Sequence, residues 1–175
     1  TNIYSFPDLE ITRHLKKIIE GIFANTGFDV VYRPHPANRY DPKIIEIKNY
    51  FKNSSRFHFD ESDNYFTTYS KSMFLITDLS GTAYTYAFLT HNPVLFISIN
   101  EDYLKKVNYD NLNYFKDRKK IGLVQESGNN IESKLKELVE KKHNLQQSIL
   151  EIRKKISYLG SSKERIKNII IDILG

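Results

Sequence analysis

The chain has 175 residues, and 26 Lys and Arg against 21 Asp and Glu give it a net charge of +5. Apolar residues make up 40% and aromatic residues 13%, which suits a packed core and excludes disorder over most of the chain. It contains no cysteine, so a disulfide framework, a thiolate metal site and a thiol nucleophile are excluded. No apolar run approaches the roughly 18 residues of a spanning helix, and the first residues lack signal-peptide features. We therefore expect a soluble domain.

The net charge lies in the C-terminal part of the chain. Residues 1–100 hold ten basic and ten acidic side chains, whereas residues 101–175 hold sixteen basic and eleven acidic ones. The excess of lysine around 134–163 is either an ordinary solvated face or a surface for anionic lipid headgroups or a polyanionic polymer. Because the chain begins with Thr1 rather than methionine, we expect it to be a piece of a longer protein.

In chain order, helices and short apolar strands alternate. The first predicted helix covers Ile11 to Ile22, after a start signal at Pro7-Asp8 and before a stop at Gly27. Apolar strands are predicted at 29–33, 56–59, 73–77, 94–97 and, at a sheet edge, 121–124. Further helices are predicted from Pro42 to Phe51, around 65–69, over 83–89 and in most of the chain after 125, whereas 98–118 is predicted to be a polar loop.

This alternation predicts an α/β fold. Short apolar strands separated by helices are typical of βαβ units, and we expect a doubly wound, mostly parallel sheet of about five or six strands with a helical C-terminal tail. Apolar residues from Ile131 to Leu159 recur at alternating spacings of four and three, so a coiled coil is an alternative to helices packed on the sheet. Ligands bind such sheets outside the carboxyl ends of the strands, so the loops after the strands are the first candidates for a site.

The loop after the strand 29–33 reads Arg33-Pro34-His35-Pro36. Two prolines restrict the backbone, so Arg33 and His35 have little freedom to lose on binding a ligand. A guanidinium can donate two hydrogen bonds to a phosphate and an imidazole can add one bond or transfer a proton, which makes His35 the candidate for a catalytic role. The alternative is a rigid turn in which Arg33 pairs with a surface carboxylate.

The loop after the strand 73–77 contains Asp78, Ser80, Gly81 and Thr82 directly before a helix. N–H groups at the start of a helix favour an anion, Gly81 permits close approach, and the two hydroxyls add donors. These features suit a pyrophosphate. The alternative is an ordinary helix cap and turn.

The segment from Phe74 to Thr82 also resembles the haloacid-dehalogenase phosphatase motif, an apolar strand that ends in Asp-x-Asp-Gly-Thr. The resemblance would make Asp78 the nucleophile and would require magnesium. However, Ser80 stands where that family has its second aspartate, and the segment lies in the middle of the chain rather than on the first strand.

Taken together, residues 29–104 resemble the C-terminal, nucleotide-binding half of GT-B transferases, with weaker similarity at 161–166. The shared pattern is Arg-x-His-Pro after one strand, a strand that ends in Thr77-Asp78, a turn of small residues, a helix, Asn92-Pro93 and a further apolar strand. It is most similar to the CDP-glycerol glycerophosphotransferase family of teichoic-acid and capsule synthesis. Bacterial sialyltransferases share the His-Pro element, which in them contacts the phosphate of a cytidine nucleotide.

The resemblance implies that Arg33 and His35 lie near the donor's phosphates and that Asp78, Ser80, Gly81 and Thr82 form a second phosphate loop. Three positions differ from the family pattern, which is approximately T-D-Y-S-S-x-x-x-D-x-A. Leu79 replaces a tyrosine, Gly81 replaces a serine, and Thr85 stands in place of an aspartate. The missing carboxylate would be a hydrogen-bond acceptor for hydroxyl groups of the donor. Its absence leaves open which hydroxyls are recognised, and therefore the identity of the donor.

The implied function is the donor-binding half of a bacterial cell-surface polysaccharide or teichoic-acid transferase, either a glycosyltransferase or a glycerophosphotransferase. Its Rossmann-like nucleotide-binding domain would span residues 1–128, and residues 129–175 would form helices that pack on this domain or on a missing N-terminal domain. The donor would be a nucleotide of CDP or CMP type and the acceptor a surface polymer or a lipid-linked hydroxyl. We expect no metal, no separate cofactor and no nucleic-acid partner. The expected location is the cytoplasm, with peripheral contact at the inner face of the membrane through the basic C-terminal helices.

A second interpretation is a non-catalytic nucleotide-binding or assembly module that uses the same sheet. The tyrosines of the predicted 98–118 loop, Tyr103, Tyr109 and Tyr114, either stack on a base or pack on their own domain. The remaining histidines have no metal-ligand spacing, and we assign them no role.

Overall fold

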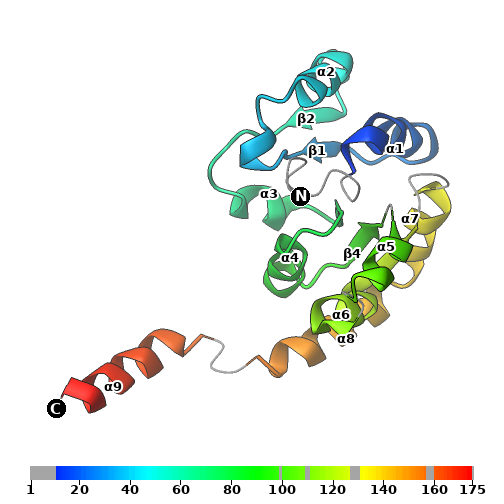
Figure 1. The fold of residues 1–175 in the computed structure, drawn as a ribbon. Helices are drawn as coiled ribbons and strands as arrows, with labels where there is room; N and C mark the ends of the chain where they lie inside the picture. Colours follow the sequence, from blue (N-terminus) through cyan, green and yellow to red (C-terminus); the bar gives the residue numbers. More distant parts are fainter. Residues whose placement is uncertain (1–10, 99, 109–110, 127–130, 157–159, 175) are drawn as a thin grey trace.

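The computed structural model describes residues 11–98, 100–108, 111–126, 131–156 and 160–174, and the predicted helix start at Pro7-Asp8 lies outside these ranges (Figure 1). The strands are β1 (Val30–Tyr32), β2 (Phe57–Phe59), β3 (Leu75–Thr77), β4 (Val94–Ile97) and β5 (Gly122–Gln125). The α-helices are α1 (Thr12–Asn25), α2 (Pro42–Phe51), α3 (Phe66–Lys71), α4 (Thr82–Thr90), α5 (Glu101–Lys106), α6 (Asn113–Ile121), α7 (Ile131–Glu140), α8 (Lys142–Lys154) and α9 (Ser162–Leu174), and a short 3-10 turn spans Pro36–Asn38.

The strands form two small parallel sheets, so the predicted α/β fold with parallel strands is confirmed. One sheet pairs β1 with β2, with Val30 opposite Phe57, and the other has the order β3-β4-β5, which places β5 at an edge as predicted. The single sheet of five or six strands is not found: within the described ranges, no ladder of hydrogen bonds joins β1 to β3.

A side-chain contact and a cavity lie between the two sheets. The rings of Phe28 and Phe74, which lie just before β1 and β3, meet edge to face with 6.0 Å between their centroids. A cavity, described below, is lined by residues of β1 and β3. Among the described residues, a ring contact and a cavity thus separate β1 from β3, and no backbone ladder joins them.

Strand β4 is buried along its whole length because helices cover both faces of its sheet. Leu95 and Ile97 face a core formed with α1, α7 and α8, whereas Val94 and Phe96 face a core formed with α3, α4, α6 and α8. This double coverage explains why the strand is apolar at every position instead of alternating.

Helix α1 joins the two sheets. Its Ile18 and Ile22 pack in the core of the three-stranded sheet, and its Leu15 and Ile19 pack against α2 and Phe57 of the two-stranded sheet. The apolar face of α1 is therefore wide enough to serve two cores.

The prediction of a polar loop over 98–118 is wrong, because this segment contains α5 and most of α6. Asn100 caps α5 by accepting a hydrogen bond from the Tyr103 N–H, 3.0 Å away, and Glu101 and Asp102 occupy the first turn, where the helix dipole favours acidic side chains. These capping signals are present in the sequence, but the many Tyr and Asn residues favoured a loop.

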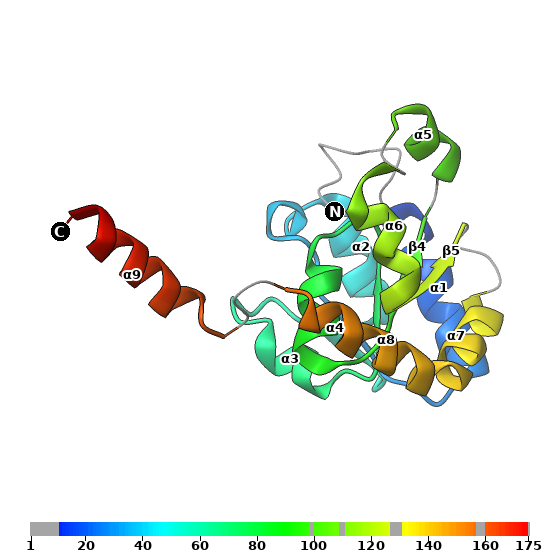
Figure 2. The same ribbon diagram turned by 90° about the horizontal axis from the view of Figure 1, so that it is seen from below.

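The C-terminal helices differ in how they pack. In α7 and α8, the apolar side chains of Leu135, Leu138, Leu145 and Ile149 are buried in the two cores that flank β4. Helix α9 lies apart from the rest of the chain in both views (Figures 1 and 2), and its residues from Ser162 to Ile173 are exposed.

We expect Gly122→Ala to destabilise the protein strongly. A Cβ at this position would lie 1.8 Å from the carbonyl oxygen of Val94, so β5 would have to move away from β4. The free energy of unfolding, measured with urea, should fall by about 3 kcal/mol. The control is Gly27→Ala, which meets nothing within 4 Å; similar losses in both variants would contradict the close approach of β5 to Val94.

Candidate functional site

The loops after β1 and β3 line the same cavity. Its volume is about 580 Å³, which is within the range of small-molecule sites. Five of the six predicted site residues are among those that line it: Arg33, His35, Asp78, Ser80 and Thr82. The sixth, Gly81, is exposed between Ser80 and Thr82.

Most of the cavity wall is apolar. Helix α1 contributes Leu15, Ile18 and Ile22 to the wall. Ile76 of β3 is among its other apolar residues. Polar groups from the loops at the carboxyl ends of β1 and β3 line the cavity, as the fold class leads one to expect. Further polar residues of the wall come from other elements, among them Thr12 of α1 and Thr68 and Lys71 of α3. The cavity thus combines an apolar body with a few polar groups, the usual composition of a site for an organic ligand.

Arg33 is held by a network at the end of β2. Its Nη1 donates to Asp60 Oδ2 at 2.8 Å and to Ser62 Oγ at 3.1 Å, and its Nη2 donates to the Ser62 carbonyl at 2.5 Å. Both terminal nitrogens therefore hold the β1 loop against the β2 loop, and the guanidinium is paired with a carboxylate. A phosphate that took both nitrogens of Arg33 would have to replace these bonds.

Asp60 is the centre of this network. Its carboxylate also accepts hydrogen bonds from the Ser62 N–H, the Ser62 hydroxyl and the Thr68 hydroxyl, at 2.9, 2.6 and 2.5 Å. Burial by itself raises the pKa of Asp60, but the hydrogen bonds from Ser62, Thr68 and Arg33 outweigh it and hold the pKa well below its usual range. Asp60 was not predicted as part of the site, although it directly follows the predicted strand 56–59, as Asp78 follows the strand 73–77.

His35 is exposed at the cavity, and one of its nitrogens is engaged. Its Nδ1 accepts a hydrogen bond from the Ala37 N–H at 3.2 Å, which caps the short turn that begins at Pro36. This bond places the Nε2–H tautomer on the neutral ring. His35 can therefore donate one hydrogen bond to a ligand through Nε2.

The loop between β3 and α4 combines a buried carboxylate with exposed hydroxyls. Asp78 is 2% exposed, whereas Ser80 and Thr82 lie nearer the surface, with their hydroxyl oxygens 2.9 Å apart. Gly81 caps α4 without a side-chain hydrogen bond, and a Cβ there would meet nothing within 4 Å. The first turn of α4 lies beside two hydroxyls and open space, and this end of the helix dipole favours an anion. Two N–H groups of this turn already donate within the loop, the Ala83 N–H to the Ser80 carbonyl at 3.1 Å and the Thr82 N–H to Ser80 Oγ at 3.4 Å, so an anion that bound them would have to share or replace these bonds.

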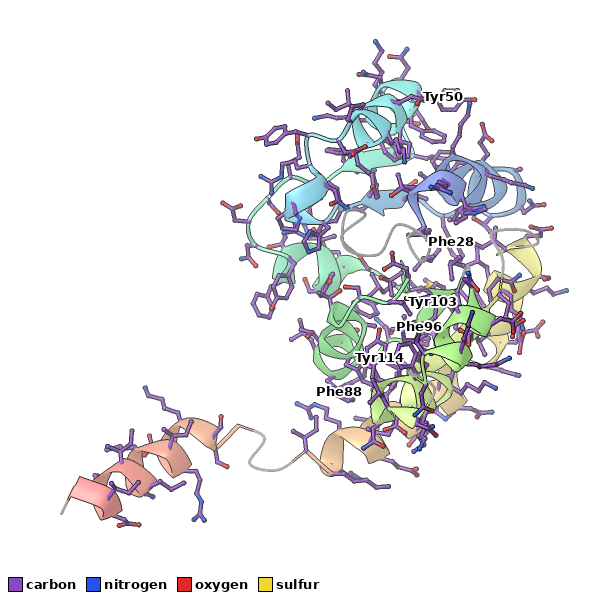
Figure 3. All side chains as sticks on the ribbon, viewed as in Figure 1. Phe28, Tyr50, Phe88, Phe96, Tyr103 and Tyr114 are labelled. Atoms are coloured by element: carbon purple, nitrogen blue, oxygen red, sulfur yellow. The ribbon has the colours of Figure 1, made fainter. Side chains whose placement is uncertain are left out.

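Two tyrosines hold this loop against α6. The Tyr114 hydroxyl donates to the Ser80 carbonyl at 3.0 Å, and the Tyr84 hydroxyl donates to the Tyr114 carbonyl at 2.6 Å. Figure 3 shows Tyr114 between α4 and α6. Burial raises the pKa of Tyr114 to about 12, so its hydroxyl stays protonated and remains a donor at neutral pH.

A buried ion pair fixes the position of α6 relative to α5. Arg118 donates to both carboxylate oxygens of Glu101, at 2.9 and 3.2 Å, and its guanidinium lies over the rings of Phe115 and Phe96. Burial raises the pKa of Glu101, but the hydrogen bonds from Arg118 and Ser98 outweigh it and lower the pKa. Of the two roles left open for Tyr114, base stacking and packing on its own domain, the structure shows the second, since its ring packs on Tyr84 and its hydroxyl donates to the Ser80 carbonyl. Tyr109 lies outside the described residues.

The part of the chain that the structure describes contains neither a metal-binding cluster nor a helix that could span a membrane. No group of three or more His, Asp or Glu side chains there is arranged so that it could hold a metal ion. Likewise, none of the described helices is long and apolar enough to cross a membrane.

Comparison with models of known protein families, with curated proteins and with solved structures found no match to this chain. The candidate site therefore stands on its geometry and on the motifs in the sequence.

Asp60→Asn should destabilise the protein in a pH-dependent way. At pH 7 the free energy of unfolding should fall by about 2 kcal/mol, because the carboxylate loses charge-assisted hydrogen bonds. The folded pKa of Asp60 lies below the unfolded value of about 3.9, so the wild-type advantage is full above that value and declines as the pH falls toward the folded pKa. Urea titrations from pH 7 to pH 3 measure it.

The matched control for this prediction is Asp63→Asn. Asp63 lies on the same loop, is fully exposed and, among the described residues, makes a single 3.9 Å contact, with Arg39. A loss of stability in Asp60→Asn that stays constant from pH 7 to pH 3 would contradict the assignment to the ionised carboxylate.

Tyr114→Phe should loosen the β3–α4 loop while leaving the fold intact. The lost hydrogen bond to the Ser80 carbonyl contributes about 1 kcal/mol, so amides of residues 81–83 should exchange with deuterium about fivefold faster. Tyr103→Phe, at a position that is 42% exposed, is the control. Unchanged exchange in Tyr114→Phe would show that Tyr114 does not hold the loop.

Proposed function

We propose that this chain is the donor-nucleotide-binding part of a bacterial cell-surface polysaccharide or teichoic-acid transferase. The observation that carries the proposal is the convergence of two loops, Arg33–Pro36 and Asp78–Thr82, on one cavity. These loops are more than 40 residues apart in the sequence. Each has polar groups that suit a phosphate, and between them lies an apolar space for the rest of a nucleotide.

We also propose that the two sheets are the halves of one doubly wound arrangement with the strand order β2-β1-β3-β4-β5. The observed orders, β1-β2 and β3-β4-β5, the parallel direction of the strands and the shared helix α1 support this Rossmann-like arrangement. In it, the strand order reverses between β1 and β3, which is where such sheets bind their ligands.

In this proposal the phosphates lie at the start of α4. The N–H groups of its first turn and the hydroxyls of Ser80 and Thr82 bind one phosphate, and His35 donates to the other through Nε2. Arg33 adds positive charge but acts mainly as a positioning residue, because Asp60 and Ser62 hold its terminal nitrogens. The buried Asp78 lies beneath this loop.

The chemistry proposed is transfer of a group from a nucleotide donor to an acceptor hydroxyl. The acceptor oxygen forms the new bond, and the departing nucleotide takes the electron pair of the broken bond. N–H groups, hydroxyls and the imidazole stabilise the negative charge that develops on this nucleotide. The base that removes the acceptor proton is not assigned to this chain, so we expect binding here without turnover.

The resemblance to the CDP-glycerol glycerophosphotransferase family favours a cytidine nucleotide, with a surface polymer or a lipid-linked molecule as the acceptor. The proposed location is accordingly cytoplasmic. No metal and no separate cofactor enter the proposal, because the groups that meet the phosphates are N–H and O–H donors.

Calorimetric titration of the chain with CMP, CDP, UMP, UDP and GDP, without added metal, tests the proposal. We expect selective binding of a cytidine nucleotide, weakened about tenfold to a hundredfold in both Ser80→Ala and His35→Ala, because each removes a hydrogen bond to a charged phosphate. Ser70→Ala is the matched control, since Ser70 lies on α3 and outside the cavity lining.

Two outcomes of this titration would contradict the proposal. Binding that survives both substitutions, or the absence of binding by every nucleotide in a chain that circular dichroism shows to be folded, would mean that the two loops are ordinary turns.

A further inference from the structure

Helix α9 carries an exposed apolar face. Its five isoleucines are between 44% (Ile169) and 75% (Ile173) exposed, although isoleucine is among the residues most often buried. Four of them form a stripe along one side of the helix at the spacing i, i+3, i+4, i+7, and they are Ile166, Ile169, Ile170 and Ile173. Figures 1 and 2 show that α9 extends away from the two sheets and the helices that cover them.

The polar residues of α9 lie mainly opposite this stripe. Glu164, Asn168 and Asp172 recur every four residues and form a polar stripe on the other side of the helix, and the fifth isoleucine, Ile171, lies at the edge of this polar stripe. The basic residues Arg165 and Lys167 lie on either side of the apolar stripe, between it and the polar stripe. Long basic side chains in such a place can lay their aliphatic parts along an apolar layer and keep their charges in a polar one.

The sequence around the start of α9 is strongly basic. Residues 153–167 contain six Lys and Arg and one Glu, a net charge of +5 that equals the net charge of the whole chain. Three of these basic residues, Arg153, Lys154 and Lys155, lie at the end of α8. An apolar stripe beside a concentration of positive charge is the pattern of a helix that lies in the surface of an anionic membrane.

We propose that α9 binds an anionic lipid surface, with its isoleucine stripe in the interface and Arg165 and Lys167 at the headgroups. At 1.5 Å per residue, its 13 residues span about 20 Å, which suits a helix parallel to the membrane rather than across it. An isolated helix of this length has marginal stability in water. Contact of its apolar stripe with lipid would therefore also stabilise the helix. The proposal does not depend on nucleotide binding.

Co-sedimentation of the chain with vesicles tests the proposal. Vesicles of equal parts phosphatidylglycerol and phosphatidylcholine should bind it, whereas pure phosphatidylcholine vesicles should bind at least tenfold less. Ile169→Gln with Ile173→Gln should reduce binding to the anionic vesicles at least tenfold, and Asn168→Gln, on the polar stripe, should not change it. Replacing Lys163, Arg165 and Lys167 together by Gln should reduce it by about a hundredfold, from about fivefold for each charge.

Several outcomes would overturn the proposal. Equal binding to neutral and anionic vesicles would show that charge does not drive the binding. Unchanged binding of the double isoleucine variant to anionic vesicles would show that α9 is not the binding element. The chain could also fail to bind vesicles and instead form a dimer in analytical ultracentrifugation. If the double isoleucine substitution dissociated that dimer, the apolar face of α9 would bind a second copy of the chain and not a membrane. Circular dichroism and thermal unfolding of each variant check that the rest of the chain remains folded.

Discussion

The structure depends on one shared helix. Because α1 packs Ile18 and Ile22 against the three-stranded sheet and Leu15 and Ile19 against the two-stranded sheet, it holds together strands that no ladder of hydrogen bonds joins among the described residues. The same helix forms a wall of the cavity between β1 and β3. The apolar face of α1 thus decides both the relative position of the sheets and the space left between them.

Around this cavity, the polar loops are positioned by groups that are themselves held in place. Asp60 and Ser62 hold Arg33 on one side, and Tyr114 holds the Ser80 carbonyl on the other. The ion pair between Glu101 and Arg118 ties α6, which carries Tyr114, to α5. Such supporting contacts keep a binding loop in one conformation and reduce the entropy that a ligand must overcome.

Local patterns in the sequence predicted the individual elements well. The five strands form close to their predicted positions because each is a short apolar run bounded by breaking residues. Helices α5 and α6 were missed because their sequence is rich in polar and aromatic residues, and their stability comes from the Asn100 cap and the Glu101–Arg118 pair. The candidate loops could be predicted, since both follow apolar strands, but the contacts that hold them could not, because Asp60 and Tyr114 reach them from other elements.

The sequence by itself determined the class of fold, the order of its elements and the residues of the two candidate loops, because these follow from periodicity, turn residues and helix signals within short windows. Only the tertiary structure decided that the strands form two sheets, that Arg33 is held by Asp60, and that Tyr114 holds the loop instead of facing a base. It also decided that the isoleucines of α9 remain exposed. These features depend on which surfaces meet in space, and contacts between residues 27 to 34 positions apart leave no signal in a local pattern.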